Sequence, residues 1–196
     1  MNLCFVGSTW KFDLTFGLTW KLDDLRRTPS IMPPLSLYDT AVLPVIRTLN
    51  VVSKILKKGE NFANTKGLPH SEFLEGRIAP DMNDLPFQIQ TMSNTAKFLA
   101  VRVGGVENQP WEDNEKTFDE LQARIAKTIQ FLEAVKRQDF EGKEGNEITM
   151  RDKKWDALGY VNEFALPNFY FHAVTTYNIL RMKGVDLGKA DWLGWR

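Results

Sequence analysis

Two stretches of this chain repeat apolar residues at alternating steps of four and three, and this spacing constrains the fold most. The first repeat consists of Tyr38, Val42, Val45, Leu49, Val52 and Leu56. The second consists of Leu85, Ile89, Met92, Ala96, Leu99 and Val103. Residues spaced in this way line one side of an α-helix and need a partner surface to bury them. We predict one helix from Ser36 to Gly59 and a second that ends at Gly104-Gly105, because glycine terminates helices.

Two later segments show helical signals as well. Thr117 followed by Glu120 forms a capping box, which predicts the start of a third helix. A fourth helix is predicted from Pro167 to Gly184, since proline is favoured in a first turn and glycine after a last one. Four helices, three of them with regular apolar seams, predict an all-α fold, and we expect an up-down-up-down four-helix bundle.

The connection between the third and fourth helices does not have helical spacing. Gly142 and Gly145 bracket a turn, and two short strands are predicted after it, Glu147–Met150 and Trp155–Val161. We therefore predict a small β-hairpin in this crossover. The segment from Val106 to Glu115 is predicted to be a loop.

The first 34 residues differ from the rest of the chain. Apolar and polar residues alternate from Trp10 to Asp23, and Thr9-Trp10-Lys11 returns as Thr19-Trp20-Lys21. Alternation with a period of two predicts a hairpin that turns near Gly17. The other interpretation is a poorly ordered extension, with Met32 as an alternative start of the protein. We divide the chain into an extension, residues 1–34, and a bundle domain, residues 35–196.

Composition limits the classes of partner. Lysine and arginine together equal aspartate and glutamate at 25 each, so no net field attracts nucleic acid or a membrane surface. No apolar run approaches the roughly 20 residues of a membrane span. Cys4 is the only cysteine, which excludes a disulfide framework and a thiolate metal cluster. We expect a cytoplasmic protein without a cofactor.

Three motifs resemble a known family. They are Arg77-Ile78-Ala79-Pro80-Asp81-Met82, Phe164-Ala165-Leu166-Pro167-Asn168-Phe169-Tyr170-Phe171-His172 and Leu187-Gly188-Lys189-Ala190-Asp191-Trp192-Leu193-Gly194. Together they are similar to an uncharacterised domain-of-unknown-function family related to the DinB/YfiT-like four-helix bundles. The resemblance covers Leu35 to Gly194 and implies the bundle fold. The family has no agreed activity that could be carried over.

The resemblance also raises the question of a metal. DinB-like relatives often hold a divalent ion on three histidines, one on the second helix and two spaced by four on the fourth. The corresponding positions here are Asn168 and His172, with Asp81 as the nearest counterpart on the second helix. Only one histidine of three is present, and zinc or nickel favours imidazole and thiolate over an amide. We therefore predict a degenerate site without metal.

The expected up-down-up-down order would make the second and fourth helices parallel, so their N-terminal ends would meet. This order would bring Asp81 to Asn168 and His172, with Gln88 beside them. His172 is then a candidate general base that the Asp81 carboxylate orients. We expect a neutral imidazole, because the positive end of the helix dipole disfavours its charged form. The alternative is structural: a paired core histidine, two helix caps and a flanking glutamine.

Three functions remain open from the sequence. The leading hypothesis is a pocket for a small organic metabolite, lined by Asp81, Gln88, Asn168 and His172, with proton transfer through the Asp81–His172 pair. The second is a non-catalytic structural domain that forms a homodimer. The third is an enzyme that depends on a divalent metal. Whether the protein is an enzyme, and on which substrate, is not determined by the sequence.

Overall fold

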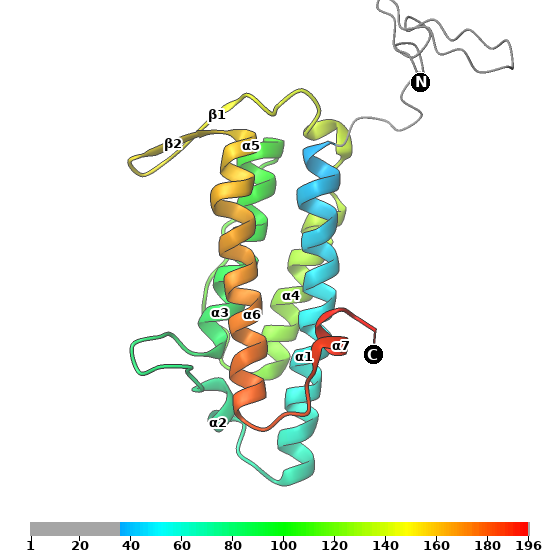
Figure 1. Cartoon of the computed structure of the whole chain (residues 1–196), viewed down its shortest axis with the longest axis vertical. Coiled ribbons are helices and arrows are strands. Elements are labelled where there is room, and N and C mark those ends of the chain that lie inside the picture. Colours follow the sequence, from blue (N-terminus) through cyan, green and yellow to red (C-terminus); the bar gives the residue numbers. More distant parts are fainter. Residues whose placement is uncertain (1–35, 196) are drawn as a thin grey trace, which may run out of the picture. The chain divides into compact units, whose positions relative to one another are not determined.

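The computed structural model describes residues 36–195, which form a bundle of four long helices (Figure 1). These helices are α1 (Leu43–Lys66), α3 (Leu85–Leu99), α4 (Phe118–Glu133) and α6 (Leu166–Met182). The shorter helical elements are η2 (Tyr38–Val42), α2 (Ser71–Leu74), η3 (Ala100–Gly104), η4 (Arg137–Asp139), α5 (Ala157–Gly159), η5 (Tyr160–Ala165) and α7 (Lys189–Trp192). The hairpin predicted near Gly17, and the extension that contains it, lie outside the described residues.

The helix seams predicted from sequence form the core of this bundle. The α3 helix packs against α4 and α6, and α1 packs against the same two helices. Leu49, Val52 and Leu56 of the first repeat are fully buried, as are Leu85, Ile89 and Met92 of the second. Among residues 36–195, no helix combines the length and apolarity needed to cross a bilayer.

The direction of the helices differs from the prediction. In Figure 1, α1 and α6 run downward while α3 and α4 both run upward. A Cβ on Gly59 of α1 would lie 2.8 Å from Leu180 near the end of α6, as expected for parallel helices. Tyr38, just before α1, meets Phe140 edge-to-face, and Phe140 follows α4, so those two helices are antiparallel. The order is therefore not up-down-up-down: the second and third long helices are parallel, and the second and fourth are antiparallel.

A long extended segment explains this order. Residues 105–117, which we call the strap, connect the end of η3 to the start of α4 without regular structure. Thirteen residues reach about 43 Å when extended, whereas the twenty residues of α3 and η3 rise only about 30 Å. The strap can therefore return the chain along the whole bundle, so that α4 starts at the same end as α3.

Prolines set where the regular parts of α1 and α6 begin. Pro44 and Pro167 lack the N–H that an α-helix needs, and in each case a π-helical turn, η2 or η5, precedes the proline. The fourth helix therefore begins earlier than predicted, because Ala157–Gly159 and η5 lead into α6 without a break. The first helix also extends beyond Gly59, to a left-handed cap at Gly67.

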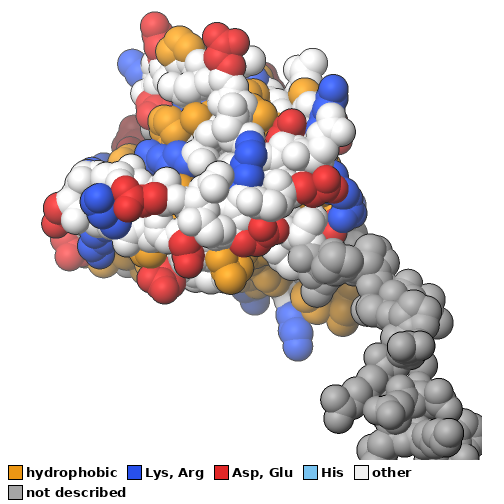
Figure 2. All heavy atoms as spheres, turned by 90° about the horizontal axis from the view of Figure 1, so that it is seen from above, with side chains coloured by type: hydrophobic (Ala, Val, Ile, Leu, Met, Phe, Trp, Pro, Cys, Tyr) orange, Lys and Arg blue, Asp and Glu red, His pale blue; other side chains and the backbone are white. Residues whose placement is uncertain are grey.

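The predicted hairpin is present, although its second strand is displaced. Strand β1 (Glu147–Met150) pairs antiparallel with β2 (Lys153–Asp156), with Ile148 opposite Trp155. The second strand ends at Asp156 because that side chain caps the following helix by accepting a bond from Gly159 N at 2.6 Å. Figure 2 looks onto this end of the bundle, where acidic and basic side chains are intermingled without a patch of one sign.

The C-terminal segment returns to α1, which explains the last of the three motifs. The carboxylate of Asp191 is buried, accepts a bond from Gly188 N at 2.7 Å and pairs with the ammonium of Lys58 on α1. Trp192 meets Tyr177 of α6 edge-to-face, with ring centroids 6.3 Å apart. The motif therefore attaches the end of the chain to the bundle.

Candidate functional site

His172 lies in the middle of the fourth helix and points towards α3. Its side chain is only 8% exposed. Its Nδ1 lies 2.7 Å from Oε1 of Gln88, which α3 presents from its first two turns. The rings of Phe87 and Phe171 meet the imidazole edge-to-face, at 6.0 and 5.2 Å. Antiparallel packing of α3 and α6 thus places Gln88 opposite His172.

A chain of hydrogen bonds fixes the tautomer of His172. The Nε2 of Gln88 donates to the backbone carbonyl of Asn83 at 2.9 Å, and a carbonyl can only accept. The other amide atom of Gln88, Oε1, must therefore accept from His172, which places the proton on Nδ1. The Nε2 of His172 therefore carries a lone pair. It has no partner among the described residues, and the atom is accessible to solvent.

Asn168 repeats this arrangement one turn earlier on the same helix. Its Nδ2 donates to Oγ1 of Thr95 at 2.8 Å, and that hydroxyl donates to the carbonyl of Thr91 at 2.8 Å. Because the Thr95 hydroxyl proton is already donated to Thr91, the Asn168 amide nitrogen must be the donor to Thr95. The Oδ1 of Asn168 then has no hydrogen-bond partner among the described residues. Positions four apart lie about 5–6 Å from one another on a helix. The α3/α6 face therefore carries two open acceptors, His172 Nε2 and Asn168 Oδ1.

Burial lowers the pKa of His172 below its ordinary value. The ring is therefore neutral at pH 7, as expected from sequence, but not for the expected reason. The fourth helix begins at Ala157, so His172 is too far from that end for the helix dipole, which acts within the first turn. A neutral imidazole with an open Nε2 can accept a hydrogen bond or take up a proton.

Asp81 is not part of this arrangement. It lies exposed in the loop before α3, and burial is the one cause that shifts the pKa of His172. No hydrogen bond or ion pair joins Asp81 to His172 in the described part of the chain, and the parallel second and fourth helices on which their predicted pairing relied are not present. The cap of α3 is Asp84, which accepts from Phe87 N at 3.2 Å. Of the four predicted site residues, Gln88 and His172 bond directly and Asn168 lies beside them.

The potential metal ligands on this face do not fit a divalent transition metal. The face offers one imidazole nitrogen and one amide oxygen, with no carboxylate or thiolate. In the described part of the chain, no group of three His, Cys, Asp or Glu side chains is placed to hold a metal ion. Zinc and nickel need more nitrogen or sulfur ligands than these.

The opposite side of α3 carries a charged cluster that the sequence analysis missed. Arg124 of α4 is 3% exposed and uses all three guanidinium nitrogens. It donates to Ser93 Oγ, Asn94 Oδ1, the Glu112 carbonyl, Asp113 Oδ1 and Glu115 Oε1, at 2.7–2.9 Å. Three of these acceptors belong to the strap, so Arg124 holds the strap against α3 and α4. The available signal was an arginine within the apolar stripe of Leu121, Ile125 and Thr128.

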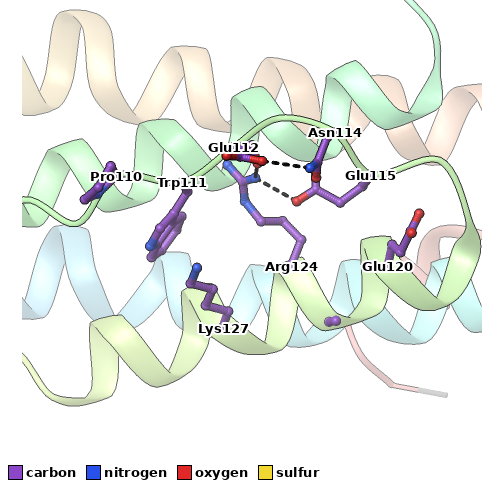
Figure 3. A pocket seen from close by; sticks show the side chains of 9 residues that line it. Pro110, Trp111, Glu112, Asn114, Glu115, Glu120, Arg124 and Lys127 are labelled. Atoms are coloured by element: carbon purple, nitrogen blue, oxygen red, sulfur yellow. Dashed lines mark hydrogen bonds and ion pairs between the residues drawn. The ribbon is translucent and has the colours of Figure 1, made fainter.

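A hollow of about 520 Å³ opens beside this cluster (Figure 3). The strap contributes residues 110–112, 114 and 115, and α4 contributes Glu120, Ala123, Arg124 and Lys127. We call it the Trp111 hollow. Three cations surround the Trp111 indole: Lys97 at 5.0 Å, Arg124 at 5.3 Å and Lys127 at 4.9 Å from its ring. A second hollow, of about 320 Å³, lies at the hairpin, and neither hollow is lined by His172.

Comparisons with known proteins agree with this fold. The family described as a domain of unknown function, DUF1993, matches residues 37–193. A crystal structure of a DinB family member from Shewanella denitrificans is 34% identical, with a TM-score of 0.77, and the match covers 81% of this chain and 92% of that one. A search of curated proteins found no match. The chain therefore belongs to the DUF1993 family, and its helix bundle is similar to that of a DinB family member.

Proposed function

We propose that this protein binds a small organic molecule on the α3/α6 face, through His172 Nε2 and Asn168 Oδ1. One observation carries the proposal: two hydrogen-bond chains fix these side chains and leave an acceptor on each. Orienting a polar group in advance lowers the entropy lost on binding. Asp81 has no role in this proposal, and the degenerate metal site needs no ion.

The chemistry of the face indicates the kind of ligand. Both open atoms accept hydrogen bonds, so the ligand must donate them. Phe87 and Phe171 are 38% and 57% exposed and offer apolar surface beside the imidazole. An aromatic or aliphatic molecule with a hydroxyl or amide N–H fits these groups. Because His172 is neutral, it is also suited to take a proton from such a donor. A cytoplasmic setting belongs to the same proposal.

Titration followed by NMR tests this binding site. Phenol, benzyl alcohol and benzamide serve as probes, and the ring nitrogens of His172 are observed. We expect a saturable shift of Nε2 with at least one probe. His172→Asn keeps a donor near the Nδ1 position but removes Nε2, so this variant should lose the response, whereas His70→Gln should retain it. If no probe shifts Nε2 up to its solubility limit, the proposal is wrong.

A second function, homodimerisation, has an observation of its own. Phe171, Val174 and Met182 form an exposed apolar stripe along α6, at 57%, 39% and 51% exposure. A second copy packed on this stripe would cover His172, so the two functions exclude each other on one face. Analytical ultracentrifugation distinguishes them. A dimer that becomes monomeric in Val174→Asp favours assembly, and a wild-type monomer favours ligand binding.

A further inference from the structure

The Trp111 hollow is lined by two residues whose hydrogen-bond donors have no acceptor among the described residues, Trp111 and Lys127. The Nε1–H of Trp111 is buried and has no partner. Lys127 makes no hydrogen bond or ion pair with any residue in the described range, yet Figure 3 shows its side chain reaching towards the indole. Buried donors are nearly always paired in native proteins, so this one calls for an explanation.

None of the glutamates around the hollow bonds Trp111 Nε1 or Lys127, and each accepts from other donors instead. Glu115 accepts from Arg124 and Gln90. Glu120 accepts from the backbone N–H groups of Lys116 and Thr117, as part of the cap of α4. Glu112 accepts from Asn114 at 3.0 Å. The donors of Trp111 and Lys127 are therefore left over after the acids are paired.

Positive charge accumulates on the same indole. Lys97 is 3% exposed and is held by the Gln109 carbonyl at 2.9 Å rather than by a carboxylate. Its pKa is lowered by burial, then by the nearby charge of Arg124, with Lys127 acting in the same direction and Asp113 opposing. An anion beside Trp111 would offset this repulsion.

We propose that the Trp111 hollow is a second binding site, which takes a small organic monocarboxylate between Trp111 Nε1 and the Lys127 ammonium. Two carboxylate oxygens match the two unused donors, and Pro110, Ala123 and the indole supply an apolar wall. The neighbouring glutamates disfavour a dianion such as phosphate. Lys127 is exposed and otherwise unbonded, so its side chain can turn to admit the ligand to the indole N–H.

The hollow has the size and rigidity that such a site needs. Its volume of about 520 Å³ falls within the range of small-molecule sites, about 300–1,000 Å³. Arg124 holds the strap by three of its residues, and Lys97 holds a fourth. The wall of the hollow is thus fixed before a ligand arrives. Space on the α4 side depends on Ala123, whose small side chain leaves room.

The test is a titration with benzoate, followed through the indole N–H signal of Trp111 in ¹H–¹⁵N spectra and assigned with Trp111→Phe. We expect a saturable downfield shift. Lys127→Met should weaken benzoate binding about tenfold by removing a charge-assisted bond. Ala123→Leu should abolish binding by filling the hollow. Both positions are exposed on α4, so these variants should fold, and thermal unfolding checks this.

Three outcomes would overturn this second site. The first is no shift of the Trp111 signal up to the solubility of benzoate. The second is an equal response in Lys127→Met. The third is an equal response to inorganic phosphate or to benzylamine, which would mean general ion binding rather than a carboxylate site. These results are independent of His172, whose probes are uncharged donors.

Discussion

The two sides of α3 differ in how completely their polar side chains are hydrogen-bonded. On the α4 side, Arg124 is charged and every one of its nitrogens is bonded, at the expense of an extended strap that must be held in place. On the α6 side, His172 and Asn168 are neutral, and each has a single side-chain partner. Leaving a buried charge without partners costs more free energy than leaving one atom of a neutral group open. The neutral side can therefore present acceptors to a ligand.

The largest effect should come from removing the charge on the α4 side. Arg124→Met removes the cation that pairs with Asp113 and Glu115 and the donor to Asn94 Oδ1, so we expect the free energy of unfolding to fall by about 3–5 kcal/mol. Urea denaturation followed by circular dichroism measures it. The control, Lys127→Met, removes an unpaired surface cation on the same helix and should change stability by less than about 0.5 kcal/mol. A loss below about 1 kcal/mol for Arg124→Met would contradict the view that the bonds of Arg124 are needed for stability.

On the α6 side, breaking the hydrogen-bond chain should have a smaller effect. Gln88→Leu leaves the Nδ1–H of His172 and the carbonyl of Asn83 unpaired, and we expect a loss of about 1–3 kcal/mol. The exposed Gln130 on α4 provides the matched control, Gln130→Leu, which should be nearly neutral. If Gln88→Leu proved as neutral as its control, the chain would not fix the histidine tautomer.

The pH dependence of stability should be weaker still, and it reports on His172 directly. Its folded pKa lies below the unfolded value of about 6.5, so the unfolded chain takes up the proton first as pH falls. Stability should therefore be complete above about pH 6.5 and decline below it, until the lowered folded pKa is reached. Denaturation measured between pH 8 and 5 should show this decline in the wild type.

The variant His172→Asn separates this effect from other titrations. Carboxylates and His70 remain in the variant, so only the contribution of His172 should disappear from the pH profile. An unchanged decline in His172→Asn would assign the slope to other groups and would argue against a buried neutral imidazole.

Local features of the fold could be predicted from the sequence, because they depend on neighbouring residues. The helix seams, the Thr117–Glu120 capping box and strand β1 are confirmed. The predicted direction of α4 was wrong. A strap of thirteen residues can place the start of α4 at either end of the bundle, and no local sequence pattern indicates which. Gln88 was included, but its contact with His172 depends on that long-range order. Arg124 could not be identified in the same way, because its role depends on strap residues that only the fold brings to it.

The smallest expected effect belongs to Lys97, and it separates two explanations for the charged side of α3. If any buried cation there were needed to hold the strap, then Lys97→Met would be as damaging as Arg124→Met. Lys97, however, bonds a single carbonyl, and burial and the charge of Arg124 both lower its pKa, so its charged form is disfavoured in place.

Methionine fills a similar volume between Phe98 and Trp111 without the cost of burying a charge. Only the Gln109 carbonyl loses its partner, and because Gln109 is exposed, water can replace it. We therefore expect a stability change of Lys97→Met within about 0.5 kcal/mol of zero, measured beside Arg124→Met under the same conditions. A loss of more than about 2 kcal/mol would show that the strap depends on both cations. The difference between the two sides of α3 would then depend on the presence of a charge and not on how completely that charge is paired.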